Sequence, residues 1–203
     1  MGYGLRPYGG LSGGYQSGGF NEYPIFPTEA DTMFTGGLAL LEASGYVTAL
    51  AATPTGATAV LSTLGVFAGF RWTDPTGQPR HSMYYDGNDL NTEPYAFIYD
   101  SPTQLFLVKS DGAIVQADMG LNANLISDAS DIDISLGSTV TGLSEINLDQ
   151  SSRAVAGTLS VRLIAIPKDG VNENSTTPNV VVMFRPGDAT TSPVHQMASA
   201  LGV

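Results

Sequence analysis

Cysteine is absent from the 203 residues of this chain, and histidine occurs only twice. Without cysteine there are no disulfide bonds, thiolate metal sites or cysteine nucleophiles, so noncovalent contacts must hold the fold together. No stretch approaches the roughly 20 apolar residues of a membrane-spanning helix. No basic start precedes an apolar run, so no signal peptide is predicted. We therefore expect a soluble protein that has no membrane as its partner.

Charge is scarce as well, and basic charge above all. Charged residues make up 13% of the chain, and 8 Lys and Arg stand against 19 Asp and Glu, which gives a net charge of −11. An acidic chain without a basic cluster is repelled by phosphate groups, so nucleic acid is not an expected partner. The negative charge either keeps the folded particle in solution or faces a basic protein partner.

The chain has few residue patterns typical of catalysis. Residues 10–14, GLSGG, match the serine hydrolase pattern G-x-S-x-G around Ser12, but that pattern needs a strand before it and a helix after it. Both flanks are rich in glycine and form neither element, so we interpret the match as a coincidence of composition. A catalytic triad would need one of the two histidines beside both a nucleophile and an orienting acid. His81 is expected in a loop or at the start of a strand and His195 in the polar tail, where surface or interface contacts are the favoured roles. We predict no catalytic and no cofactor-binding residues, and the chain is not expected to be an enzyme.

An acidic run, SDASDIDIS, places Asp128, Asp131 and Asp133 close together. Such oxygen clusters suit hard cations such as Ca²⁺. The spacing is not that of an EF-hand loop, and no bidentate glutamate follows. The pattern therefore favours a solvated loop, with cation binding as the alternative, and no metal site is predicted.

Short segments rich in β-branched and aromatic residues dominate the middle of the chain, and turn residues bound them. Asp111-Gly112 between two apolar runs predicts a hairpin. The sequence therefore predicts an all-β fold, a single sandwich or barrel with long loops. The predicted strands are residues 47–52, 64–70, 94–100, 104–110, 113–118, 158–166 and 179–184.

The first 24 residues are rich in glycine and tyrosine. Glycine resists ordering, whereas tyrosine supplies a large, stiff contact surface. We expect residues 1–24 to form an extended N-terminal arm that is loose alone and orders against another surface. Residues 25–186 are the expected β body, and residues 187–203 are a polar C-terminal tail.

Several segments, taken in order, resemble one family. They are GLRP near the start, LGVFAGF, YAFIYDSPTQLFLV, AIVQADMGLNANL, GSTVTGLSEINLD and TLSVRLIAI followed by PKDGVNEN. In this order they resemble small structural proteins of tailed bacteriophages, the capsid decoration or cement proteins. The SDASDIDIS run and the long C-terminal tail depart from that pattern.

The resemblance implies binding to the outer surface of a phage head, where the protein bridges neighbouring major capsid protein subunits and stabilises the shell. The protein would be made in the host cytoplasm and reside on the virion, and self-association as a dimer or trimer is plausible. The expected capsid-contacting residues of the arm are Tyr3, Leu5, Arg6, Pro7, Tyr8, Tyr15, Phe20 and Tyr23.

Two other functions remain open at this point. One is a head-fibre or tail-associated β module that binds a host receptor or glycan, for which Trp72, Tyr84, Tyr85 and Tyr95 could supply stacking surfaces. Their alternative role is in the core or in subunit contacts. The other function is a hydrolase, which would require Ser12 beside a histidine and an acid.

Overall fold

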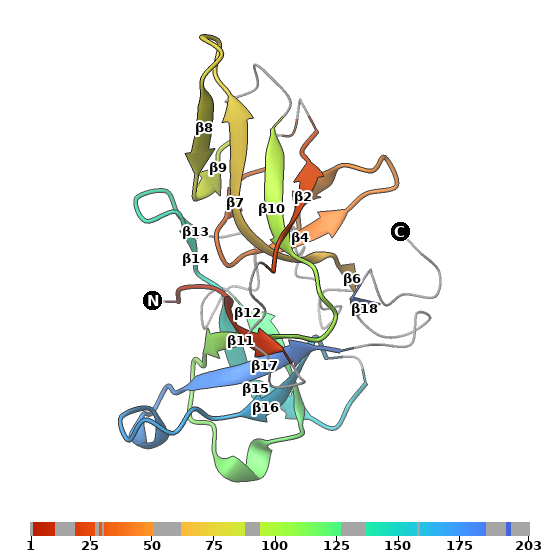
Figure 1. Cartoon of the computed structure of the whole chain (residues 1–203). Coiled ribbons are helices and arrows are strands. Elements are labelled where there is room, and N and C mark those ends of the chain that lie inside the picture. Colours follow the sequence, from red (N-terminus) through yellow and green to blue (C-terminus); the bar gives the residue numbers. More distant parts are fainter. Residues whose placement is uncertain are drawn as a thin grey trace.

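The computed structural model describes residues 2–10, 19–26, 29, 31–50, 62–87, 94–126, 137–157, 159–185 and 194–195. Within these ranges the chain forms β-strands and two single-turn 3₁₀ helices, η1 (Gln116–Asp118) and η2 (Asn172–Asn174). The all-β prediction is therefore confirmed. Most strands belong to two sheets, which Figure 1 shows one above the other.

The lower sheet in Figure 1 contains six antiparallel strands in the order β1-β11-β17-β16-β12-β15. An isolated bridge joins Ser110, directly after β11, to Leu148 in β15 at the far end of that order, so the sheet curls. Its strands are β1 (Arg6–Gly10), β11 (Gln104–Lys109), β12 (Asn122–Ile126), β15 (Asn147–Ala154), β16 (Val161–Ala165) and β17 (Asn179–Phe184).

The upper sheet has the order β2-β10-β7-β4-β5, and β8 pairs with β7. Ile25, directly after β2, forms a single bridge with Val47 in β5, so the two edges meet at one residue pair and the described strands form no closed barrel. The strands are β2 (Asn21–Pro24), β4 (Leu38–Leu41), β5 (Val47–Ala49), β7 (Gly65–Thr73), β8 (Pro79–Ser82) and β10 (Tyr95–Tyr99).

Three two-stranded ladders complete the described strands. β3 (Met33–Phe34) and β9 (Tyr84–Tyr85) form an antiparallel pair that covers the upper sheet's core. β13 (Gly137–Ser138) and β14 (Leu143–Ser144) are antiparallel and are joined by a turn. β6 (Ser62–Thr63) and β18 (Val194–His195) form a parallel pair.

Each curled sheet encloses its own apolar core. Along β11 the side chains alternate, so that Phe106 and Val108 are buried on one face of the strand. The lower core also takes Leu38 and Val66, a cross-strand pair of the upper sheet, and this pair joins the two cores. The upper core comprises Ile25, Met33, Ala39, Val47, Ala49, Leu64, Phe67, Phe70, Tyr85, Ala96 and Ile98.

The predicted hairpin at Asp111-Gly112 and the predicted strand at 113–118 are wrong. β11 pairs with β1 and β17 instead of with the segment that follows it. The Asp111 amide donates to the Leu148 carbonyl, and the Asp111 carboxylate accepts from the Gln150 amide, so this dipeptide connects to β15. Residues 113–118 then form a loop that ends in η1. Local turn chemistry does not specify which strands pair.

The described parts of the predicted arm are strands of the two sheets. β1 is one edge of the lower sheet and β2 is one edge of the upper sheet. Leu5 is 2% exposed and belongs to the lower core. The sequence predicted an arm that is loose until it meets another surface. The described parts of this segment instead pair with β11 and β10 of the same chain and bury Leu5.

A contact between two glycines fixes the N-terminal segment against the junction of the two sheets. Gly4 and Gly36 have φ angles of 71° and 86°, which favour glycine. A Cβ on Gly4 would lie 2.7 Å from the Gly36 carbonyl oxygen. The Leu5 amide donates to that oxygen at 2.9 Å, and the Gly36 amide donates to the Phe67 carbonyl at 2.8 Å. The contact thus links the lower sheet's edge segment to β7.

We predict that Gly4→Ala lowers the free energy of unfolding by at least about 1–3 kcal/mol, because alanine is strained at this φ and its Cβ overlaps Gly36. Gly9→Ala is the matched control. A Cβ there meets no atom within 4 Å and needs no positive φ, so it should be neutral or slightly stabilising, by up to roughly 1 kcal/mol. Urea unfolding of both variants measures this difference, and equal stabilities would contradict the glycine contact.

Candidate functional site

Most residues that the sequence offered for chemistry lie outside the described ranges. Ser12 and the three aspartates of SDASDIDIS lie outside them. His81 is exposed on β8, and His195 is part of β18. Among the described residues, no three metal-ligating side chains gather at one place. In the same ranges no helix has the length and hydropathy to span a membrane.

Exposed aromatic rings are concentrated in the N-terminal segment. Among the described residues, the aromatic side chains that are large, hydrophobic and exposed are Tyr8, Phe20 and Phe26, at 49%, 44% and 42%. The other exposed large hydrophobic residues are one methionine and four valines spread over the remainder of the chain. Exposed rings near an ordered backbone are typical of protein interfaces.

Phe20 belongs to an aromatic group on the outer face of the upper sheet. Along β10, Tyr95, Phe97 and Tyr99 are half-buried and alternate with fully buried residues. The Phe20 ring lies 4.8 Å from the Phe97 ring and 6.1 Å from the Tyr99 ring. His81 also stacks on Phe97, with the ring centroids 6.1 Å apart. We call Phe20, His81, Tyr95, Phe97 and Tyr99 the outer aromatic face.

An ion pair lies across the outer aromatic face. Arg71 on β7 donates to the Glu22 carboxylate on β2 at 2.6 Å, and its guanidinium stands 4.6 Å over the Tyr95 ring. The hydrogen bond from Arg71 holds the pKa of Glu22 below its ordinary value. Both side chains are about two-fifths exposed, so the pair stabilises the fold little and chiefly orients the Tyr95 ring.

A buried carboxylate anchors β2 to the upper sheet. Asp100 is 7% exposed and accepts hydrogen bonds from the Tyr23 hydroxyl at 2.5 Å and from the Asn21 amide at 2.8 Å. Burial, and then the hydrogen bond to Asp100, raise the pKa of Tyr23. Both donors come from the N-terminal segment, so this group fixes the backbone on which Phe20 is carried.

The predicted contact residues on β1 and just before it divide into buried and exposed positions. The Tyr3 hydroxyl donates to Asn179 Oδ1 at 2.5 Å, and the Arg6 guanidinium lies 4.2 Å over the Tyr3 ring. Burial raises the pKa of Tyr3. Arg6, Pro7 and Tyr8 are exposed, whereas Leu5 is a core residue that no partner can reach in this fold. Tyr15 lies outside the described residues.

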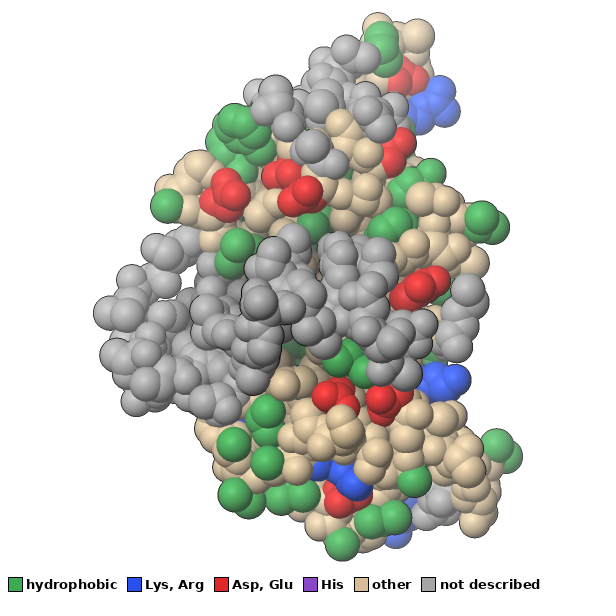
Figure 2. Space-filling model, turned by 180° about the vertical axis from the view of Figure 1, so that it is seen from behind, with side chains coloured by type: hydrophobic (Ala, Val, Ile, Leu, Met, Phe, Trp, Pro, Cys, Tyr) green, Lys and Arg blue, Asp and Glu red, His purple; other side chains and the backbone are tan. Residues whose placement is uncertain are grey.

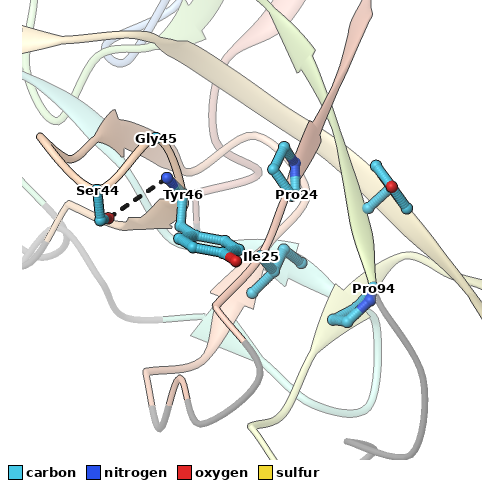
Figure 3. Close-up of a pocket in the computed structure, with 7 residues that line it drawn as sticks. Pro24, Ile25, Ser44, Gly45, Tyr46 and Pro94 are labelled. Carbon is cyan, nitrogen blue, oxygen red and sulfur yellow. Dashed lines mark hydrogen bonds between the residues drawn. The ribbon is translucent and has the colours of Figure 1, made fainter.

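A pocket of about 390 Å³ lies beside the outer aromatic face (Figure 3). One wall of the pocket is the β4–β5 turn with Ser44, Gly45 and Tyr46. The opposite side is formed by the end of β2 and the start of β10, with Pro24, Ile25, Pro94 and Tyr95. Tyr95 therefore belongs to both the pocket and the outer aromatic face.

Exposed Phe26 extends the apolar surface at the pocket. Its ring meets the Tyr46 ring edge to face, with the centroids 5.1 Å apart. The predicted contact residues did not include Phe26, Tyr46 or Phe97. The aromatic alternation of YAFIY along β10 was a usable signal for Phe97, whereas the approach of Tyr46 to β2 leaves no local pattern in the sequence.

The four aromatic residues considered for sugar stacking are not equally accessible. Tyr85 is fully buried in the upper core, which excludes it as a stacking surface in this fold. Tyr84 stacks on Phe34 and Trp72 stacks on Phe70, and both are half-buried. Tyr95 alone of the four lines the pocket.

Acidic side chains are visible on the face seen in Figure 2, both above and below its central region. Hydrophobic side chains occur there in small separate groups, and basic side chains are few. This distribution agrees with the net charge of −11.

A scan against protein-family models and searches of curated proteins and of solved structures found no match to this chain. Its function is therefore inferred from its own residues. The surfaces available for that inference are the exposed N-terminal rings, the outer aromatic face and the pocket.

We predict that Tyr23→Phe lowers the free energy of unfolding by about 1–3 kcal/mol, because buried Asp100 loses one of its two donors. The folded state raises the pKa of Tyr23 above its ordinary value of 10.0, so this contribution is complete below pH 10 and declines as the pH rises further.

Urea unfolding at about pH 8 and about pH 11 measures both effects, since the difference between the unaltered chain and the variant should shrink at the higher pH. Tyr8→Phe, at an exposed ring, is the control and should change stability by less than about 0.5 kcal/mol. A difference that stays constant or grows with pH would argue against the Tyr23–Asp100 contact.

Proposed function

We propose that this chain is a decoration protein of a tailed-bacteriophage capsid. It binds the outer surface of the head, bridges neighbouring subunits of the major capsid protein and stabilises the shell without catalysing a reaction. The ordered series of sequence segments that resembles this family supports the proposal. The acidic charge agrees with a position on the outer surface, away from the packaged DNA.

The observation that carries the proposal is the placement of Tyr8, Phe20 and Phe26. All three rings are exposed, and all three lie within the first 26 residues, on or beside strands at the edges of the two sheets. Protein interfaces use exposed aromatic rings of this kind as anchors. The N-terminal segment is therefore the proposed contact with the capsid.

The form of these edges indicates how the contact is made. Edge strands can recruit a partner strand through their free backbone groups, and proline at an edge prevents this. Pro7 lies in β1 and Pro24 lies in β2. We therefore propose that side chains, and not added strands, make the capsid contact.

The division of the segment between the two sheets supports the proposed bridging. Tyr8 is carried by the lower sheet, and Phe20 packs on the upper sheet. One molecule thus presents rings from both sheets and can contact two capsid subunits. Because these strands already pair in the free protein, docking does not have to supply the roughly 1–2 kcal/mol per residue of ordering a loose backbone.

The alternative, a head-fibre or tail-associated module that binds a receptor or glycan, has less support from the described residues. Tyr85 is buried, and Tyr84 and Trp72 already stack on core rings. Self-association as a dimer or trimer stays a prediction that either function allows.

We predict that the triple variant Tyr8→Ser, Phe20→Ser, Phe26→Ser binds isolated capsids of the encoding phage at least about tenfold more weakly than the unaltered chain. Truncation of an interface anchor typically costs more than 1 kcal/mol, and about 1.4 kcal/mol corresponds to tenfold in affinity. Co-sedimentation with capsids that lack the protein measures the change.

The matched control is Val140→Ser, Val155→Ser, Val171→Ser, which removes three exposed apolar side chains from other parts of the molecule. This control should bind like the unaltered chain. Equal binding by both triple variants would exclude the N-terminal rings as the contact, and failure of the unaltered chain to bind capsids would overturn the proposed function.

A further inference from the structure

We propose that the pocket between β2, β10 and the β4–β5 turn binds an extended, proline-containing peptide segment of a partner protein. The inference rests on the proposed function in so far as that segment belongs to a capsid subunit. The pocket's own chemistry, which is independent of the identity of the partner, supplies the argument.

The shape of the pocket suits a narrow chain. Ile25 is 1% exposed and belongs to the upper core, so its side chain supplies an apolar base. Tyr46 stands on one side, and Pro24 with its cross-strand neighbour Tyr95 stands on the other. Figure 3 shows the Tyr46 ring directed toward Ile25, with Pro24 and Pro94 across from the turn. Aromatic and proline rings that face each other form the kind of groove that binds polyproline II segments.

The described lining of the pocket is neutral, because none of its seven residues carries a charge. A charged ligand would lose its hydration against these residues without gaining a partner. A carbohydrate would need several donors and acceptors for its hydroxyl groups, and the described lining residues include no carboxylate, carboxamide or guanidinium. The lining favours apolar ring-to-ring contact with few hydrogen bonds.

Two tyrosine hydroxyls supply those few hydrogen bonds. The hydroxyls of Tyr46 and Tyr95 have no hydrogen-bond partner among the described residues, although both rings are held by neighbours, Phe26 and Arg71. A polyproline II segment makes no internal hydrogen bonds, so its carbonyl groups remain free to accept from such hydroxyls. Proline also reaches the bound conformation with little loss of entropy.

The walls are already in place before binding. The Gly45 amide donates to the Glu42 carbonyl and the Glu42 amide donates to the Tyr46 carbonyl, which closes a tight hairpin turn with Gly45 at a φ of 83°. The Ile25 amide donates to the Pro94 carbonyl at 2.9 Å, which ties the opposite wall together. A preformed pocket does not have to be ordered by its ligand.

The test is a titration of the ¹⁵N-labelled full chain with a synthetic peptide of about ten prolines, followed by amide chemical shifts. Saturable shifts at Ser44, Gly45, Tyr46 and Tyr95 are expected. Tyr46→Ala should weaken binding at least about tenfold, and Tyr46→Phe, which removes the hydroxyl alone, by a smaller factor. Val171→Ala, at an exposed side chain outside the pocket, should leave binding of this peptide unchanged.

The absence of saturable shifts at these residues would overturn the proposal, and so would shifts with maltotriose in place of the proline peptide. Tyr46→Phe keeps the experiment informative if Tyr46→Ala does not fold. No capsid is present in this titration, so its failure is distinguishable from a failure of the proposed function, which the co-sedimentation of the unaltered chain tests separately.

Discussion

The close approach of Gly4 to Gly36 is the contact on which the N-terminal half of this structure depends. Two backbones meet where neither side has room for a Cβ, and the Leu5 amide bonds across the contact. Leu5 then enters a core that it shares with Leu38 and Val66 of the other sheet. One segment thereby holds two curled sheets together in a chain that has no disulfide bond.

This arrangement explains why glycine and tyrosine occur together near the N-terminus. Glycine permits the close backbone approach at Gly4, and tyrosine hydroxyls reach half-buried Asn179 and buried Asp100. Once the backbone is fixed in this way, Tyr8 and Phe20 are left exposed on rigid strands or beside them. The N-terminal segment thus stabilises the fold and also presents exposed aromatic rings. The proposed contact with a capsid rests on these rings.

The all-β class and most strand positions were predictable because strand composition and bounding turn residues are local signals. The Asp111-Gly112 hairpin was mispredicted because a turn does not specify its pairing, and β11 pairs with β1 and β17. Tyr8 and Phe20 were predicted from the composition of the N-terminal segment, whereas Phe26 was not among the predicted contact residues. The burial of Leu5 and the pocket were not predictable, because each depends on segments far apart in the sequence, such as Gly4 with Gly36 or Tyr46 with Pro94.

Whether the N-terminal segment docks on the capsid can be measured by hydroxyl-radical footprinting of the free protein and of the protein on capsids. This method reports the solvent exposure of individual rings. We expect Tyr8, Phe20 and Phe26 to be labelled in the free protein and protected on capsids, whereas buried Tyr85 stays unlabelled in both states. Equal labelling of the three exposed rings in the free and bound states would contradict the claim that the N-terminal segment is the docking surface.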